Sequence, residues 1–484
     1  MKQLNIRILL TVLLSIIGLN ASAHDIEMQN KGKTIYYNYI NNNTELSVTY
    51  RFFSYSDYSN EYTGNVVIPE SVTYEGKTYK VTSIGSEAFR DCTGLTSVTI
   101  GNGVTEIGTS AFRDCTGLTS VTIGEKVKWI GGYAFHDCTK LTSVTIPYSV
   151  ISIGYEAFYG CSGLTTVTIG EKVTEIGTSA FFGCSGLTSV SIPKSVTNIG
   201  NSAFNGCSGL KSITIPKTVT SIGYHAFSNC SDLTSINVAS GNTRYDSRDN
   251  CNAIIETAHN TLIVGCQSTI IPNSVTSIGE SAFSGCSGLT SFDIPNSVTW
   301  IGSYAFYRCS GLTSVTIGNS VTSIGEYAFD GCSGLTSITI PNSVKSIGNT
   351  AFWGCSSLTS ITILNSMTSI GGNVFFGCSG LKAVYNYATI PQTLEDDPQF
   401  NYSTATLHVP AGVKELYQAA NYWKNFSKIV DDIPTAINNV ERDVNVSLKV
   451  KSISSIDGRS LSLPQKGINI QKMSDGTARK VVID

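Results

Sequence analysis

The side chains best suited to metal binding, redox chemistry and nucleophilic attack in this chain are fourteen cysteines and five histidines. Twelve of the cysteines close an Ala-Phe-x-x-Cys motif or its close variant and recur every 23 residues, with one longer interval of 56 residues after Cys230. They are Cys92, Cys115, Cys138, Cys161, Cys184, Cys207, Cys230, Cys286, Cys309, Cys332, Cys355 and Cys378. Zinc sites use paired C-x₂₋₄-C spacing, which the chain lacks. Stacked cysteines of neighbouring repeats would point the same way and not at each other, so we expect a buried apolar ladder of thiols.

The other candidate catalytic groups do not form a recognisable constellation. The five histidines are scattered at His24, His136, His225, His259 and His408, without a Ser/Asp or Cys partner in a known motif. The segment from Asp246 to Asn250 is rich in oxygen ligands but lacks the ligand spacing of a calcium loop. The sequence therefore predicts a protein that is not an enzyme and that holds no cofactor and no metal.

The fixed period indicates the architecture that must position these residues. A repeat of 23 residues is typical of a solenoid with one supersecondary unit per coil. In the first unit Leu95, Val98 and Ile100 end in strict alternation, which predicts a strand with one buried face. Ala88, Phe89 and Cys92 are spaced to share one face of a short helical turn. The predicted fold is a β-rich solenoid whose core is a set of side-chain ladders.

A glycine follows the isoleucine of every unit, from Gly85 to Gly371. Glycine at one fixed point indicates either a positive φ or a close approach of the next coil. Ser97 and Thr99 occupy the outward strand positions, where β-branched and hydroxyl side chains suit a solvated sheet face. Stacking at about 4.8 Å per coil would make the sheet of a dozen coils roughly 60 Å long.

Composition and the N-terminus indicate an exported protein. The net charge is −3 and only 14% of the 484 residues are charged, which argues against nucleic acid or an anionic membrane as partner. Residues 1–23 have early positive charge, an apolar run and an Ala21-Ser22-Ala23 cleavage site, which together predict a signal peptide. The alternative is a buried N-terminal strand. No stretch approaches the ~18 apolar residues of a transmembrane helix.

The remaining segments flank or interrupt the array, which we place at residues 81–384. Residues 24–80 are expected to be a β cap on the first coil, the alternative being an independent binding domain. Residues 385–432 are expected to form a C-terminal cap with one last strand and a helix, and residues 433–484 a small β-rich domain with a hairpin turn at Asp475-Gly476. We expect the protein to be a monomer.

One unit carries additional residues, at about 239–270. Ala253-Ile-Ile and Leu262-Ile-Val are predicted to be two strands joined by a tight turn near Ala258-His259. This register would place Cys251 opposite Cys266, where an oxidising compartment favours a disulfide. The alternative is a reduced, packed pair of thiols.

Aromatic side chains at non-core offsets are the better indication of a binding surface, because exposed Trp and Tyr commonly anchor protein or glycan contacts. These candidates for ligand contact are Trp129, Tyr133, Trp300, Tyr304, Tyr307, Tyr327 and Trp353. The alternative for each is packing against the neighbouring coil. A flat Ser/Thr face could also bind an ordered lattice such as ice, but the serine half of each pair argues against this.

The repeat Ile-Gly-x-x-Ala-Phe-x-x-Cys-x-x-Leu-x-x-Ile-x-Ile-Pro closely resembles the BspA-like leucine-rich repeats of bacterial surface proteins, although the Asn ladder of ordinary leucine-rich repeats is absent. The flanks, Asn65-Val-Val-Ile-Pro before the array and Trp423-Lys-Asn-Phe after it, are similar too. The last part of the chain resembles C-terminal sorting domains of a Gram-negative outer-membrane secretion system, but it has Gly467-Ile-Asn-Ile in place of a clear Gly-x-Tyr pattern.

The resemblance implies a secreted, surface-displayed adhesin that binds proteins or glycans of host matrix or of neighbouring cells. The family has no fixed binding residues that would transfer to this chain. A structural surface protein without a specific ligand is the alternative. Clustered exposed aromatics would favour the adhesin, and a uniform Ser/Thr surface would favour the structural protein.

Overall fold

The structure, a computed structural model, describes residues 23–51 and 61–434, and the backbone of four strands between residues 450 and 483. The predicted signal peptide lies outside the described residues except for its last position. Within the described parts, no helix is both long and apolar enough to cross a lipid bilayer.

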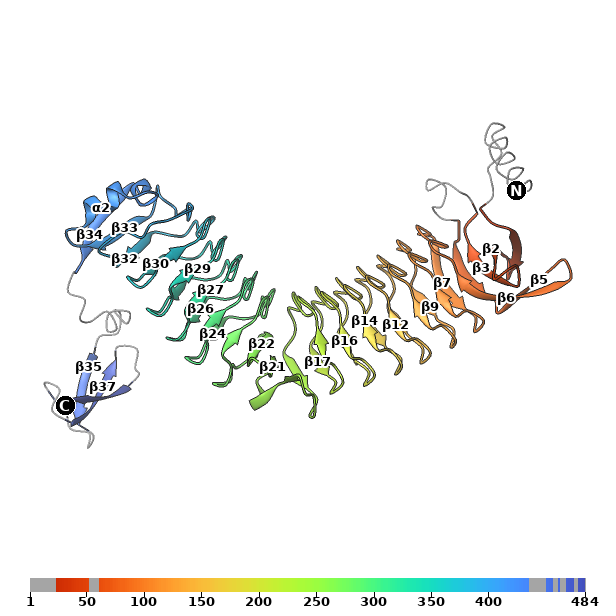
Figure 1. Cartoon of the computed structure of the whole chain (residues 1–484), viewed down its shortest axis with the longest axis horizontal. Coiled ribbons are helices and arrows are strands. Elements are labelled where there is room, and N and C mark those ends of the chain that lie inside the picture. The colour runs from red at the N-terminus through yellow and green to blue at the C-terminus, as the bar shows by residue number, and fades with distance from the viewer. Residues whose placement is uncertain are drawn as a thin grey trace.

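The described chain is a solenoid that curves in a broad arc (Figure 1). Each coil contributes one strand to each of two parallel stacks. In a central coil these are β14 (Glu175–Ile176) and β15 (Ser189–Val190). β14 pairs with β12 (Ser152–Ile153) and β16 (Asn198–Ile199), each one period away. The predicted β-rich solenoid is confirmed.

The segment between the two strands of a coil consists of hydrogen-bonded turns, where the sequence predicted a helical turn. The Ala180 amide donates to the Gly177 carbonyl at 3.1 Å, and the Cys184 amide donates to the Phe181 carbonyl at 3.2 Å. The Phe181 amide donates instead to Ala203 of the next coil at 2.8 Å. Bonds between coils therefore replace the internal bonds of a helix.

The buried side chains stack as ladders. The rings of Phe158 and Phe181 lie parallel with centroids 5.3 Å apart, and both are fully buried. The outward positions of the strands, such as Ser120 and Thr122 in β9 (Ser120–Thr122), are exposed. Repetition of this pattern explains why most strands beyond β7 (Leu95–Ile100) need only two to four residues: their hydrogen bonds and apolar contacts come from the adjacent coils.

The glycine that follows the isoleucine of every unit is needed because the backbones of two coils approach closely there. A Cβ on Gly177 would lie 2.7 Å from the Ile153 carbonyl oxygen of the previous coil, and its φ is not positive. Only hydrogen fits between the two coils at this point. Of the two explanations that the sequence offered, a close approach of coils is therefore correct and a positive φ is not.

The buried cysteines pack in the core and also donate hydrogen bonds to the preceding coil. The Cys184 thiol donates to the carbonyl of Phe158 in the previous coil, with sulfur and oxygen 3.2 Å apart. Equivalent bonds recur in the coils before and after the insertion, as between Cys332 and Phe306 at 3.1 Å. Burial raises the pKa of the Cys92 and Cys207 thiols to about 12 and that of the Cys184 thiol well above its ordinary value. They are therefore protonated and inert at neutral pH.

The N-terminal strands continue one stack of the solenoid. β1 (Ile26–Asn30), β2 (Lys33–Ile40) and β3 (Glu45–Thr49) form an antiparallel run, and β3 pairs in parallel with β6 (Lys77–Ile84). β6 pairs in turn with β8 (Glu106–Ile107), while β4 (Gly64–Ile68) pairs with β7 (Leu95–Ile100) of the other stack. A hairpin turn at Glu75-Gly76 joins β5 (Ser71–Tyr74) to β6.

At the C-terminal end of the solenoid, three strands extend one of its two stacks of strands. They are β32 (Ala383–Asn386), β33 (Thr406–Pro410) and β34 (Lys428–Ile433), whereas the sequence predicted one last strand in this part of the chain. The predicted helix is α2 (Lys414–Ala419) followed by a 3₁₀ turn at Trp423–Asn425. Trp423 is fully buried, so this segment closes the core.

Four further strands form a separate antiparallel sheet. They are β35 (Val450–Ser455), β36 (Ser460–Leu461), β37 (Gly467–Met473) and β38 (Ala478–Ile483). The predicted turn at Asp475-Gly476 lies outside the described residues. The domain boundaries and the sorting role of this segment remain predictions.

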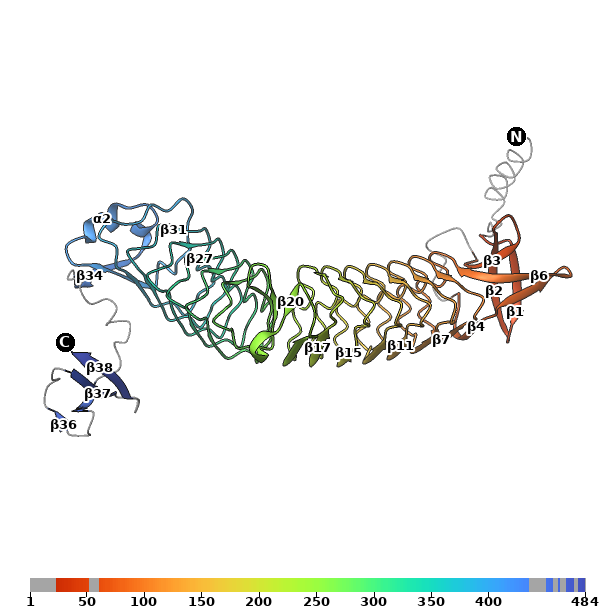
Figure 2. The ribbon, with the colours of Figure 1, turned by 60° about the horizontal axis from the view of Figure 1, so that its bottom comes forward.

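The insertion divides the solenoid. One stack of the first array ends at β18 (Ser221–Ile222) and the other at β19 (Ser235–Val238). A new sheet then begins with β20 (Tyr245–Asp246), β21 (Ile254–Glu256) and β22 (Thr261–Val264) and continues through β23 (Ser277–Ile278) (Figure 2). The buried side chains form two separate clusters, one on each side of this point.

The predicted pairing of Cys251 with Cys266 needs correction. β21 and β22 have the expected register at Ile255 and Leu262, but a bulge shifts the pairing by one residue at Ile254, which faces Val264. Both cysteines are buried free thiols. Cys251 packs with the second core cluster and Cys266 with the first, so the hairpin keeps them on different sides.

Candidate binding groove

The coil before the insertion lacks two backbone hydrogen bonds that every other coil of the array makes. In the preceding coil the amides of Ser202 and Phe204 each donate at 2.8 Å, to the carbonyls of Tyr224 and Ala226. The equivalent amides of His225 and Phe227 have no acceptor within the described residues. We call these two positions the empty rungs.

The empty rungs arise because the insertion supplies its own strand to the second array. The Gly279 amide, which by the repeat would donate to Ile222, donates to Leu262 of β22 at 2.7 Å. The Gly265 amide donates to Ala282 at 2.7 Å and so takes the role of Phe227. A Cβ on Gly265 would lie 2.1 Å from the Phe283 ring, so glycine leaves room for this ring, which is the first of the second phenylalanine ladder.

A groove of about 320 Å³ results between the two arrays. Residues 222–228 form one wall, residues 279–282 with Trp300 form the other, and Thr261, Ile263 and Val264 contribute from β22. Its volume is in the range of ligand pockets. Tyr224 is 66% exposed and Trp300 is 41% exposed, so both offer apolar ring surface to a partner. We call this feature the seam groove.

The predicted aromatics divide into two groups in the structure. Tyr133, Tyr304, Tyr307 and Tyr327 are half-buried and contact other tyrosine rings. Tyr304 stacks in parallel on Tyr327 of the next coil at 4.7 Å, whereas Tyr133 and Tyr307 make edge-on contacts. Trp129, Trp300 and Trp353 keep 41–48% of their surface exposed. The structure brings Trp300 to the seam groove and places Tyr304 beside His225, at 6.5 Å between ring centroids.

Sequence reasoning missed Tyr224 and considered His225 only as a catalytic residue; both lie at variable positions of the last coil before the insertion. Tyr148 and Tyr155 were also missed, although they are 60% and 49% exposed. Lys172 lies over the Tyr148 ring at 4.7 Å, so this tyrosine contacts a cation and lies outside the groove. The sequence did contain one signal for Tyr224: it lies in the unit after which the insertion displaces the next coil.

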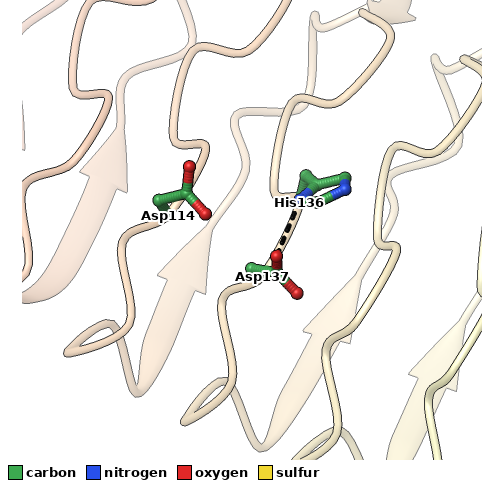
Figure 3. A group of neighbouring side chains, drawn as sticks. All are labelled: Asp114, His136 and Asp137. Carbon is green, nitrogen blue, oxygen red and sulfur yellow. Dashed lines mark ion pairs between the residues drawn. The ribbon is translucent and has the colours of Figure 1, made fainter.

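Among the described residues, one group has donors suited to a divalent cation: Asp114, His136 and Asp137 (Figure 3). Their candidate ligand atoms lie within 4.8 Å of one another. The Nε atom of Arg113 lies 3.2 Å from the Asp114 carboxylate, and His136 Nδ1 lies 3.1 Å from Asp137. Arg113 already balances the Asp114 charge, and we assign this group to local ion pairs between neighbouring residues of each coil.

A second depression, of about 520 Å³, lies on the exposed strand face. Lys194 and Lys217 border it together with Ser191, Ser212 and Thr214. It lacks aromatic side chains and follows the regular repeat, so it offers less shape to a ligand than the seam groove does.

The model of the BspA type leucine rich repeat region matches residues 64–187, 130–255 and 260–382. A leucine rich cell surface protein from Faecalibacterium prausnitzii is 33% identical, with a TM-score of 0.61 over 76% of this chain and 96% of its own. A leucine-rich repeat protein from Bacteroides ovatus is 29% identical, with a TM-score of 0.55 over 84% and 99%. The pneumococcal vaccine antigen PcpA, at 19% identity and TM-score 0.53 over 85% and 99%, shares the fold. No curated protein sequence matches significantly.

Proposed function

Because the chain belongs to the BspA-type leucine-rich repeat family, we propose that it is a bacterial cell-surface protein that adheres to proteins or glycans of host matrix or of neighbouring cells. The solenoid would act as a non-catalytic scaffold that presents a binding site. The similar protein from Faecalibacterium prausnitzii is described as a cell surface protein, which supports the location.

The observation that carries this proposal is the seam groove. A regular solenoid presents nearly the same surface on every coil, so a specific contact needs a point at which the repeat is broken. The insertion provides that point in mid-array and flanks it with the exposed rings of Tyr224 and Trp300. Aromatic side chains around a desolvated pocket are typical centres of binding energy.

The chemistry of the buried thiols supports a non-catalytic role. Burial raises the pKa of the Cys184 thiol well above its ordinary value, as it does for its neighbours in the ladder. A thiol that stays protonated and inaccessible is a poor nucleophile. We therefore assign the cysteines to packing and to hydrogen bonds between coils.

A structural surface protein without a specific ligand is the second candidate, and the regular strand face favours it. Threonine hydroxyls on this face bond to the preceding coil, as Thr165 does to the Thr142 carbonyl at 3.0 Å. Their hydrogen-bonding capacity is thus partly used within the solenoid, which leaves a uniform surface.

Binding of the purified mature protein to immobilised matrix proteins and glycans distinguishes the two candidates. Trp300→Ala combined with Tyr224→Ala should reduce saturable binding by about tenfold or more, because it removes the ring surface of the seam groove. Trp353→Ala is the matched control, since Trp353 is also 41% exposed but lies outside the groove. Equal losses in both variants, or no saturable binding to the panel, would contradict the adhesive role of the groove.

A further inference from the structure

We propose that the seam groove accepts an extended segment of a partner protein, whose backbone fills the two empty rungs. This inference rests on the proposed binding function and specifies its ligand. The partner segment would take the place that the next coil occupies everywhere else in the array.

The spacing of the free donors is that of a backbone partner. In the regular coils the two donors are two residues apart, and they bond to two carbonyls that are also two residues apart, as Ser202 and Phe204 do with Tyr224 and Ala226. An extended peptide presents carbonyls on one edge at this same interval. His225 and Phe227 retain the donor spacing, and their amides have no acceptor within the described chain.

The groove also offers acceptors. The Ile222 carbonyl would receive the Gly279 amide in an uninterrupted array, as Ile199 receives Gly223 at 2.8 Å. The Glu280 carbonyl occupies the position of the Tyr224 carbonyl in the preceding coil. No backbone or side-chain donor reaches either oxygen within the described residues. The wall with the two free donors therefore also carries a free acceptor at Ile222, and the facing wall carries one at Glu280. Such donors and acceptors match the alternating groups of a polypeptide, which is how sheet edges capture peptides.

A buried side chain in the wall also lacks a partner. Ser281 is only 6% exposed, lines the groove, and its hydroxyl makes no hydrogen bond. A buried hydroxyl without a partner is costly, and a ligand group that bonds to it would relieve that cost. A glycan could also meet such a hydroxyl, but it lacks the regular pairs of carbonyl and amide groups that the two walls require.

The side chains of the groove indicate which peptide fits. Trp300, Tyr224 and Ile263 favour an apolar residue between them. Glu280 is the carboxylate of the lining, which contains no lysine or arginine. We therefore expect neutral or basic segments to bind more tightly than acidic ones.

The first test uses the full mature protein and an uncharged probe peptide with the sequence of residues 199–206, Ile-Gly-Asn-Ser-Ala-Phe-Asn-Gly, acetylated and amidated at its ends. This segment forms a rung in the array. Residue-resolved amide hydrogen exchange should show that saturating peptide slows exchange at His225 and Phe227 by about tenfold or more. The already bonded amides of Ser202 and Phe204 are the internal control and should not change.

A deletion of residues 240–272 supplies the second test. It removes 33 residues and restores the 23-residue period, so that Ala239 is followed by Asn273 as in a regular unit. We expect the His225 and Phe227 amides to be protected without peptide in this variant, and peptide binding to be lost. A peptide with N-methyl groups on alternate amides should bind the natural chain at least about tenfold more weakly, because it cannot donate to the carbonyls of the groove.

The outcomes separate this inference from the proposed function. Matrix binding that depends on Trp300, without slowed exchange at His225 and Phe227 under any bound matrix protein or probe peptide, would overturn the peptide inference alone. A matrix glycan that binds and leaves both amides unprotected would do the same. Protection by the peptide together with no binding to the matrix panel would support the groove and contradict matrix adhesion. If the deletion variant does not fold, exchange in the natural chain still decides the matter.

Discussion

The amide of Asn229 donates to the carbonyl of Ser284 at 2.8 Å, directly across the insertion. The two arrays therefore touch through one rung of the regular ladder, immediately beyond the two rungs that are empty. The seam is closed at this end and open toward Tyr224 and Glu280, which gives the groove its shape.

The two core clusters predict two unfolding transitions. Trp129 lies in the first array, and the remaining tryptophans, Trp300, Trp353 and Trp423, lie in the second array and its C-terminal segment. Since few ladder contacts cross the seam, we expect the arrays to unfold at different urea concentrations. Trp129 is 48% exposed, so a Trp129→Phe variant removes the one tryptophan of the first array at little cost. Its fluorescence then follows the second array alone, and comparison with circular dichroism of the same sample measures this difference.

Deletion of residues 240–272 should merge the two transitions into one, because it joins the ladders. Coincident transitions in the natural chain would show that the seam transmits cooperativity, contrary to this prediction.

Alanine at Gly177 should destabilise the first array by about 2–4 kcal/mol. The added Cβ would lie 2.7 Å from the Ile153 carbonyl oxygen, so that two coils would have to separate. Chemical denaturation of the variant measures the loss. Ser191→Ala, on the exposed strand face, is the control and should change the free energy of unfolding by less than about 0.5 kcal/mol. A loss at Gly177 no larger than at Ser191 would contradict the close-approach argument.

Alkaline pH should destabilise the fold. Burial raises the pKa of Cys92 and Cys207 from an ordinary value of 9.0 to about 12, so the folded state favours the neutral thiol. The resulting stabilisation is fully present below pH 9 and is lost as the pH rises toward 12, because the unfolded state releases its protons first.

Urea denaturation at a series of pH values between 7 and 11 tests this dependence. Cys207→Ala should show a shallower decrease of the unfolding free energy above pH 9 than the natural chain. A stability that stays constant to pH 11 would argue against buried neutral thiols.

Fourteen free thiols should be found when the oxidised, purified protein is denatured without a reductant and treated with an alkylating reagent. The hairpin directs Cys251 and Cys266 into different core clusters, which leaves both as thiols. Mass spectrometry counts the alkylated sites. Twelve sites, with Cys251 and Cys266 unmodified, would establish the disulfide that the sequence register suggested.

The repeat could be predicted from sequence because each offset recurs in every unit. The buried places of Phe89, Leu95 and Ile100 follow from spacing alone, and so does the glycine at Gly177. The thiol bonds to phenylalanine carbonyls could not be predicted, because they depend on the exact stacking of turns between adjacent coils. The same holds for the turns that replaced the expected helix.

The seam groove was less predictable for a different reason. The sequence located the insertion and its two strands, but the empty rungs at His225 and Phe227 depend on which backbone β22 joins. That choice follows from Gly265, whose missing side chain admits the ring of Phe283. A single glycine outside the repeat pattern carries no visible signal of this role. Trp300 could be singled out from its residue type alone. The role of Tyr224 could not, because it depends on the displacement of the coil that would otherwise lie next to it.

Because the coils are stacked, the length of each array can change without changing the seam groove. Each coil is held by the same ladder contacts to the next, so adding or removing a whole unit in either array would lengthen or shorten that arm by about 4.8 Å. The insertion and its two adjoining coils would be unaffected. Recombination between near-identical units could therefore change the length of either array without altering the residues that line the seam groove.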